Sequence, residues 1–260
     1  MHLFNKGAFV NHSFTFVETT GSTNDDLKAD WKSLPPPLRV IVARHQSAGR
    51  GRNGGTWLDS SGKSLLFSFS WIFPDSIASS DHFPIPLTCA VALHGALSKF
   101  ADGMNSIWIK WPNDIWARDS KLAGILVETT FFRGMIAVVV GIGVNLYKMK
   151  YETSSEGCDN AFRSTSLEDI GIHVSSDDLL IAVSEEWQRV WTCPDPVSLA
   201  NEFYSRSSGF WGRKVEIEPT DGEKIIGITE GIDSTGAIRI KREDGVITKL
   251  VAPSRVKFIT

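Results

Sequence analysis

The strongest constraint on the fold is a change in sequence character at about residue 208. From there to residue 260 the chain consists of short runs rich in β-branched residues, separated by Asp-Gly and Ser-Thr-Gly turns. The runs expected to form strands are 215–217, 224–228, 237–240 and 246–250. Short strands with regularly spaced turn residues are typical of small all-β domains. The pattern predicts a small β-barrel of about five strands over residues 209–260, after a separate domain over residues 1–208.

The first 208 residues alternate between strand-like and helix-like segments. Apolar runs predict strands over residues 14–18, 39–43, 64–72, 107–111, 123–130 and 135–140. Helical spacing of apolar residues and capping residues predict helices over 24–32, 86–100, 177–191 and 197–206, with Thr23 and Ser176 as N-caps. We therefore expect an α+β fold in which helices flank a central mixed β-sheet.

Composition excludes several classes of protein. The 27 basic and 30 acidic residues leave a net charge of −3, so no excess of positive charge indicates a nucleic-acid partner. The longest run of apolar residues and glycine, 135–144, is half as long as a membrane span, and no signal-peptide core begins the chain. Three widely separated cysteines suit reduced thiols. We expect a cytoplasmic protein with neither a membrane nor a nucleic acid as partner.

Residues 48–55, AGRGRNGG, hold four glycines and two arginines. Glycines let a backbone approach an anion closely, and arginines add fork-shaped contacts to phosphate or carboxylate. The spacing differs from that of a P-loop, and no helix follows, as a dinucleotide-binding fingerprint would require. The segment alone leaves two interpretations open: an exposed hairpin loop, or a mobile anion clamp in which Arg50 and Arg52 act.

A second polar segment, KWPND, spans residues 110–114. Pro112 favours an extended or turn conformation before it, so that Lys110 and Asp114 can flank a tight connection between strands. The two charges could bind phosphates and a hydrated Mg²⁺, although a hairpin whose polar residues bond their own backbone is equally consistent with the pattern. Lys121 begins the next apolar run, where a lysine is usually a solvated strand end.

Two segments of small residues complete the set. GSTN at residues 21–24 can cap a helix or surround a compact polar ligand. GIGVN at residues 141–145 follows a predicted strand, where glycines indicate a turn or a ligand lying against the backbone.

Taken in order, these segments resemble those of biotin–protein ligases: GSTN, Gln46 before AGRGR-x-G-x-x-W, KWPND, KLAGILVE and GIGVN. The resemblance is strong over residues 14–148 and looser over 165–171 and the β-rich tail. It implies a class II synthetase-like ligase domain followed by an SH3-like β-barrel. In that family, biotin and ATP form biotinyl-5′-adenylate and pyrophosphate. A lysine of a carboxylase's biotin carboxyl carrier domain then attacks the mixed anhydride.

The resemblance also implies roles for the matched residues, with ATP and biotin as substrates and Mg²⁺ as the metal. Joining two anions requires positioning and positive charge, and the expected catalytic cations are Lys121, Arg50 and Lys110. The expected biotin-binding residues are Ser22, Thr23, Asn24, Gln46, Arg50, Gly51, Arg52, Lys121, Gly124 and Gly141. The expected ATP- and adenylate-binding residues are Arg50, Arg52, Trp57, Lys110, Asn113, Asp114, Lys121 and Asn145. Asp114 is also the expected magnesium ligand.

Two departures from the family pattern affect the expected function. Bifunctional members carry an N-terminal winged-helix domain, whereas GSTN begins here at residue 21, so we expect no repressor role. Asn53 and Gly55 replace basic residues of some members, which bears on how firmly the adenylate is retained. The alternatives are a lipoate–protein ligase and a non-catalytic biotin or nucleotide sensor, and both a monomer and a homodimer remain open.

Overall fold

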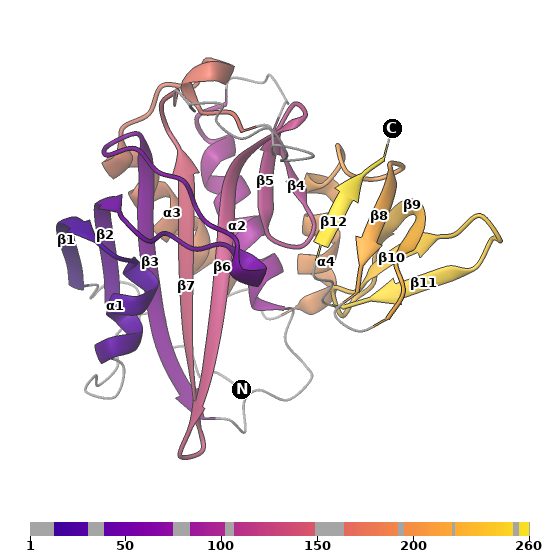
Figure 1. Ribbon diagram of the computed structural model, residues 1–260, viewed down its shortest axis with the longest axis horizontal. Coiled ribbons are helices and arrows are strands. Elements are labelled where there is room, and N and C mark those ends of the chain that lie inside the picture. The colour runs from indigo at the N-terminus through magenta and orange to yellow at the C-terminus, as the bar shows by residue number, and fades with distance from the viewer. Residues whose placement is uncertain are drawn as a thin grey trace.

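The computed structural model describes residues 13–30, 39–74, 84–101, 107–148, 164–191, 195–219, 222–251 and 255–259. These residues form a seven-stranded sheet with helices on its faces and a separate five-stranded sheet (Figure 1). The predicted α+β fold, with a mixed central sheet and a small C-terminal β unit, is confirmed. None of the helices in the described ranges is long and apolar enough to cross a membrane.

The seven-stranded sheet is mixed because one of its neighbouring pairs is parallel. β1 and β2 run parallel, and every other neighbouring pair is antiparallel. In spatial order the strands are β1 (Ser13–Thr20), β2 (Arg39–Gln46), β3 (Ser64–Pro74), β7 (Met135–Asn145), β6 (Ser120–Phe132), β5 (Asp114–Ala117) and β4 (Ile107–Lys110).

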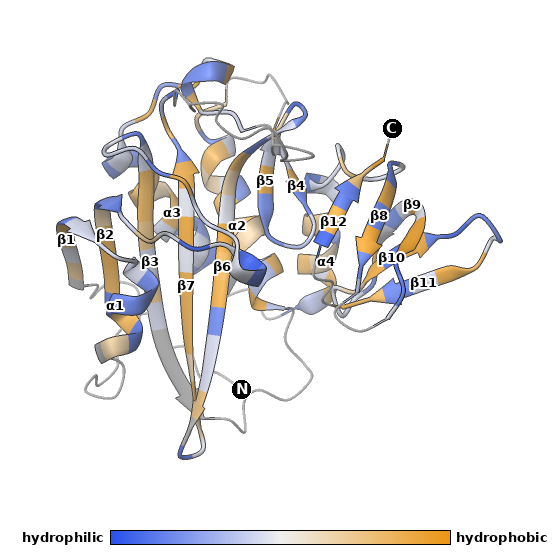
Figure 2. Ribbon diagram, in the orientation of Figure 1, coloured by the Kyte–Doolittle hydropathy of each residue, from blue (hydrophilic) through white to orange (hydrophobic). Residues whose placement is uncertain are grey.

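The two faces of this sheet differ in their cover. α2 (Ile85–Ser98) and α3 (Ser176–Trp191) pack on one face, where the rings of Phe69 and Trp187 lie 4.8 Å apart between centroids. α1 (Thr23–Asp30) lies on the other face. The segment from β2 to β3 also crosses that face, in front of β7 and β6, and is coloured mainly hydrophilic (Figures 1 and 2). A polar surface is thus built on one side of a sheet whose other side belongs to the core.

The C-terminal sheet is antiparallel throughout. Its order is β11 (Ile247–Leu250), β10 (Ile238–Lys241), β9 (Ile225–Ile232), β8 (Lys214–Glu218) and β12 (Arg255–Phe258). α4 (Pro196–Arg206), capped by Asp195, precedes it. The sheet packs against the larger one through Trp111, whose Nε1 donates to the carbonyl of Gly236 at 3.1 Å.

The structure corrects three local predictions. GIGVN does not follow its strand as a turn, because residues 141–145 are the last five residues of β7. Strand β5 was not predicted, since its four residues follow directly on the tight connection after β4. The helix caps shift by one residue: α1 begins at Thr23 itself, and Ser175, rather than Ser176, accepts the backbone hydrogen bond of Asp178 at 3.1 Å. The predicted end of the first helix, at residue 32, lies outside the described residues.

Candidate functional site

The predicted site residues gather along the face of the large sheet that bears α1. On this face Gly124 of β6 pairs with Gly143 of β7, and Gly141 of β7 pairs with Ser68 of β3. Residues two apart in a strand point to the same side, so Gly124 and Glu128 share this face. The glycines leave the sheet backbone open to whatever lies above it.

The glycine-rich segment forms a hydrogen-bonded turn over this face. Arg50 and Thr56 form an isolated antiparallel bridge, and the backbone N–H of Gly51 donates to the carbonyl of Gly55 at 2.6 Å. The Trp57 N–H donates to the carbonyl of Gly49 at 2.9 Å. A Cβ on Gly49 would lie 2.9 Å from the Trp57 carbonyl oxygen, so this close approach requires glycine. The turn therefore fixes where Trp57 enters the site.

Trp57 occupies the space above two of the sheet glycines. A Cβ would lie 2.5 Å from Trp57 Cε2 if placed on Gly143, and 2.9 Å from Cζ3 if placed on Gly124. The indole Nε1 is buried and has no hydrogen-bond partner among the described residues. The glycines of KLAGILVE and GIGVN thus accommodate an aromatic ring on the sheet.

A chain of hydrogen bonds lies at the α1 end of the site. Both the backbone N–H and the hydroxyl of Thr23 donate to Gln46 Oε1, at 2.8 and 3.0 Å. The Thr23 hydroxyl also contacts that of Ser68 at 2.6 Å, and Ser68 donates to Asn24 Oδ1 at 2.6 Å. Asn24 in turn lies over Gly141, where a Cβ would collide with its amide oxygen. Ser22, Thr23 and Asn24 are all buried, so GSTN, Gln46 and Gly141 form one polar cluster.

Arg50 joins this cluster through two carboxylates that sequence analysis did not select. Its guanidinium donates to Asp25 and, at 3.1 Å, to Glu128 Oε2. The hydrogen bond with Asp25 raises the pKa of Arg50 and lowers that of Asp25. Burial opposes the effect at Glu128, but hydrogen bonds from Lys28 and Asn24 hold the pKa of this carboxyl below its usual range.

The other end of the site centres on Asp114. Lys121 Nζ lies 2.7 Å from Asp114 Oδ1, and Arg52 Nη1 donates to Asn113 Oδ1 at 3.2 Å. Lys110 and Asp114 are direct partners in the β4–β5 pair, as expected of residues that flank a tight connection. Arg52, Asn113, Asp114 and Lys121 therefore lie together, although they belong to three separate segments of the sequence.

Lys110 lies under the C-terminal sheet. Its side chain is buried, and Nζ donates to the carbonyl of Val256 at 3.0 Å. The ammonium lies 4.5 Å from the ring centroid of Trp116 and 5.0 Å from that of Phe258. Burial lowers the pKa of Lys110 to about 8, although the nearby charge of Asp114 acts in the opposite direction. Its charge is thus held at the junction of the two sheets.

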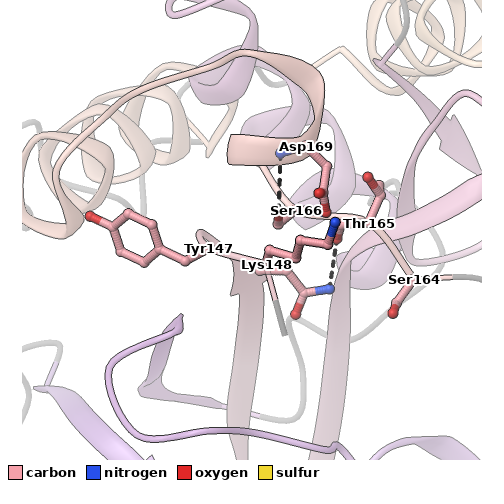
Figure 3. Close-up of a pocket in the computed structure, with 7 residues that line it drawn as sticks. Tyr147, Lys148, Ser164, Thr165, Ser166 and Asp169 are labelled. Carbon is pink, nitrogen blue, oxygen red and sulfur yellow. Dashed lines mark hydrogen bonds between the residues drawn. The ribbon is translucent and has the colours of Figure 1, made fainter. Parts of the chain in front are cut away.

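Asn145 lies at the edge of a small polar pocket. Its Nδ2 donates to the carbonyl of Thr165 at 3.0 Å, and its Oδ1 is buried without a partner among the described residues. The residues that line the pocket are Asn145, Tyr147, Lys148, Ser164, Thr165, Ser166 and Asp169. In Figure 3 the ring of Tyr147 points away from the other labelled side chains. The Thr165 N–H donates to the carbonyl of Lys121 at 2.9 Å, which places this pocket beside the Lys121 strand.

The structure offers few further metal-binding side chains near Asp114, the expected magnesium ligand. The described parts of the chain contain no group of three His, Cys, Asp or Glu side chains that could hold a metal ion. Asp114 supplies one carboxylate, which is paired with Lys121. Magnesium at nucleotide sites is commonly held by one or two carboxylates together with substrate phosphates, so Asp114 fits only a metal that arrives with a nucleotide.

Sequence analysis missed Asp25, Lys28, Ser68 and Glu128. A signal existed for Glu128, because it ends KLAGILVE and lies four residues after Gly124, on the same face of an extended strand. Asp25 directly follows GSTN, yet its contact with Arg50 joins positions 25 residues apart and depends on the path of the loop.

The sequence is similar to those of known proteins. A family model described as "Biotin/lipoate A/B protein ligase family" matches residues 16–145. The "Bifunctional ligase/repressor BirA" of Escherichia coli is 31% identical over 213 residues, which are 80% of this chain and 63% of that protein. The "Biotin--[acetyl-CoA-carboxylase] ligase" of Mycobacterium tuberculosis is 30% identical over 227 residues, covering 85% of this chain and 80% of that protein. The chain thus spans less than two thirds of the length of the BirA protein.

Solved structures share the fold. "Biotin protein ligase from Aquifex aeolicus in complex with biotin and ATP" superposes with a TM-score of 0.75 at 22% identity, covering 95% of this chain and 99% of that one. The biotin protein ligase of Leishmania major in complex with biotinyl-5-AMP gives a TM-score of 0.63 at 21% identity, covering 92% and 99%. At these identities the likeness establishes the architecture of both sheets.

Proposed function

Because the chain belongs to the biotin/lipoate A/B protein ligase family, we propose that it is an ATP-dependent biotin–protein ligase. It forms biotinyl-5′-adenylate and pyrophosphate from biotin and ATP. It then transfers the biotinyl group to a lysine of a biotin carboxyl carrier domain of a carboxylase. The observation that supports this most directly is the grouping of GSTN, GRGR, KWPND, KLAGILVE and GIGVN on one face of the sheet.

The α1 end of the site suits the biotin head group. A ureido group offers one carbonyl and two N–H groups, which need a few placed polar partners in an otherwise apolar pocket. Ser22, Thr23, Asn24 and Gln46 supply small hydroxyl and amide groups in a buried cluster. Gly141 leaves room for the Asn24 amide, and Gly51 belongs to the glycine-rich turn that carries Arg50. We assign these residues to recognition of the bicyclic ring.

Adenylation takes place, in this proposal, near Asp114 and Lys121. An oxygen of the biotin carboxylate attacks the α-phosphorus of ATP, and the bond to the β,γ-pyrophosphate breaks. Lys121 and Arg52 are cations at this end, and positive charge stabilises the negative charge that gathers on the α-phosphoryl oxygens. Arg50 stands at the opposite, biotin end, so the cations serve two different parts of the ligand. Gly124 allows a ligand to lie close to the Lys121 strand once the Trp57 ring, which lies over this glycine, has shifted.

The nucleotide is assigned to the region of Trp57 and Asn145. The unpartnered indole N–H of Trp57 and amide oxygen of Asn145 are groups with unused hydrogen-bonding capacity. Asn113 and Asp114 face the phosphates, and Asp114 is the residue that would hold Mg²⁺ brought by ATP. Lys110 is buried at the junction with the C-terminal sheet, and its positive charge acts on the phosphates from there.

Transfer to the carrier domain needs no further cofactor. The amine of the acceptor lysine attacks the carbonyl carbon of the mixed anhydride, AMP leaves with the bonding electrons, and the nitrogen gives up a proton. The glycine-rich turn above the sheet shields the anhydride from water until the acceptor arrives.

We propose a division into a ligase domain, residues 1–208, and a β-barrel domain, residues 209–260. The positions of α4, which ends at Arg206, and β8, which begins at Lys214, support this boundary. We place the reaction in the cytoplasm, where ATP and reduced thiols coexist.

The decisive experiment is ATP–pyrophosphate exchange with biotin, lipoate and octanoate tested in parallel. We expect exchange that depends on biotin, followed by labelling of a carrier-domain lysine. Stimulation by lipoate instead of biotin would refute the proposal in favour of a lipoate–protein ligase. Binding of biotin and ATP without labelling of any acceptor would indicate a sensor.

A further inference from the structure

Glu128 of β6 is a point at which helix and loop meet the sheet. Its carboxylate accepts hydrogen bonds from Asn24 Nδ2 and Lys28 Nζ, both at 2.7 Å, and from Arg50 Nη2 at 3.1 Å. Asn24 and Lys28 belong to α1, whereas Arg50 belongs to the glycine-rich turn. One half-buried side chain therefore ties two neighbouring elements to the sheet.

Asp25 completes this arrangement from α1. Its carboxylate pairs with Arg50 through one oxygen and lies 3.1 Å from Lys28 Nζ through the other. Each of the two carboxylates, Asp25 and Glu128, thus contacts each of the two cations, Arg50 and Lys28. Networks of several charges contribute more to structure than isolated surface pairs do. We call these four residues the charge square.

The charge square also determines how Asn24 is oriented. An amide donates only through its nitrogen and accepts only through its oxygen. Because Glu128 accepts from Asn24 Nδ2, the Asn24 oxygen faces Ser68, which donates to it at 2.6 Å. From Ser68 the contacts continue through Thr23 to Gln46. Glu128 therefore contacts Arg50 directly and the polar cluster at the head-group end through Asn24.

We propose that Glu128 and Asp25 are positioning residues: they seat Arg50 and Asn24 before substrate arrives and keep the glycine-rich turn on the sheet. The part that concerns biotin rests on the proposed function, whereas the part that concerns the turn does not. Groups held in their binding geometry spare a ligand the cost of ordering them. Glu128→Gln weakens this support, because it removes the charge and keeps only one accepting oxygen. Lys28 and Asn24 donate to different oxygens of Glu128, so the new NH₂ would face one of these two donors and could not accept from it.

The first test needs no substrate. We expect amide hydrogen exchange of residues 49–57 to be about tenfold faster in Glu128→Gln than in the unaltered protein, since a charged hydrogen-bonded contact is lost. Asp25→Asn removes one carboxylate of the square and should give a smaller acceleration, which keeps the test valid if Glu128→Gln folds poorly. Glu18→Gln is the matched control, because Glu18 forms an exposed pair with Arg44 elsewhere on the sheet. Unchanged exchange in both Glu128→Gln and Asp25→Asn would overturn the proposal.

The second test separates positioning from stability. In biotin-dependent ATP–pyrophosphate exchange, Glu128→Gln should raise the KM for biotin about tenfold and leave the KM for ATP unchanged. A lower kcat with both KM values unchanged would indicate a smaller active fraction and contradict the proposal. In an Arg50→Gln background, Asp25→Asn should not change the KM for biotin any further. A full additional increase in this KM would show that Asp25 does not act through Arg50. Absence of any exchange in the unaltered protein would refute the proposed function but leave the hydrogen-exchange test intact.

Discussion

The indole of Trp57 lies directly on the backbone of Gly143, where a Cβ would come within 2.5 Å of ring atom Cε2. The ring also covers Gly124, its neighbour across the β6–β7 pair. The sequence leaves a turn and a ligand against the backbone as two explanations of the glycines in GIGVN, whereas in the structure the Trp57 ring lies against Gly143. The space above them holds protein in this structure, so a ligand lying against these glycines requires Trp57 to shift.

Gly143→Ala should therefore destabilise the chain through Trp57. The new methyl group cannot coexist with the ring, and overpacking of this kind costs about 1–3 kcal/mol. Urea unfolding measures the change. In a Trp57→Ala background the same substitution should cost less than about 0.5 kcal/mol, since the colliding ring is gone. An equal cost in both backgrounds would mean that the methyl group meets something other than Trp57.

Lys121→Ala should reduce adenylation severely while the protein remains folded. Lys121 is partly exposed and pairs with Asp114, so its loss leaves the core intact. Removal of one preorganised charge at a reacting phosphoryl group commonly costs about 10²–10³ in kcat. Pyrophosphate exchange and thermal unfolding together give the result. Lys214→Ala, in an exposed pair with Glu243, is the matched control and should leave exchange unchanged. Normal exchange in Lys121→Ala would remove this residue from the catalytic set.

Much of the fold follows from the spacing of apolar residues. The predicted strands over 39–43, 123–130 and 135–140 are all present and longer than expected. Strand β5 escaped prediction because its four residues follow directly on the tight connection after β4. Its place is determined by pairing with β4 and β6, which is information that a single segment of sequence does not contain.

The candidate site, like the fold, was predicted only in part from the sequence. The polar identities of GSTN and KWPND are visible in the sequence, and the structure brings each group to one end of the sheet. The side chains and carbonyls that contact the cations cannot be identified from the sequence. Arg50 meets Asp25 and Glu128 because the glycine-rich turn folds back over α1 and β6. Lys110 is buried because a strand 146 residues later in the chain covers it.

Arg52→Gly should weaken retention of the adenylate. Arg52 links the glycine-rich turn to Asn113 at 3.2 Å, and the substitution removes this link while adding backbone freedom. Loss of a charged hydrogen bond corresponds to about a tenfold faster release of the bound intermediate. Mass spectrometry of bystander proteins mixed with the variant, biotin and ATP would detect their labelled lysines. Labelling no greater than with the unaltered protein would contradict the role of the turn as a cover.

Lys110 gives the chain a distinctive dependence of stability on pH. Burial lowers its pKa from the ordinary 10.5 to about 8 in the folded chain, despite the opposing influence of Asp114. Between these two values the unfolded chain binds more protons at this residue, so the free energy of unfolding rises with pH across this window. The contribution amounts to at most about 3 kcal/mol, and it stops changing below pH 8 and above pH 10.5.

Lys110→Met isolates this contribution, because methionine keeps an apolar stem against Trp116 and Phe258 without the charge. We measure the free energy of unfolding of both proteins with urea at several pH values. As the pH increases from 8 to 10.5, the value for the unaltered protein should rise relative to that for Lys110→Met. Lys214→Met, on the exposed face of the C-terminal sheet, should run parallel to the unaltered protein. Parallel curves for Lys110→Met as well would mean that the Lys110 ammonium is solvated, and that β12 does not close over it in solution.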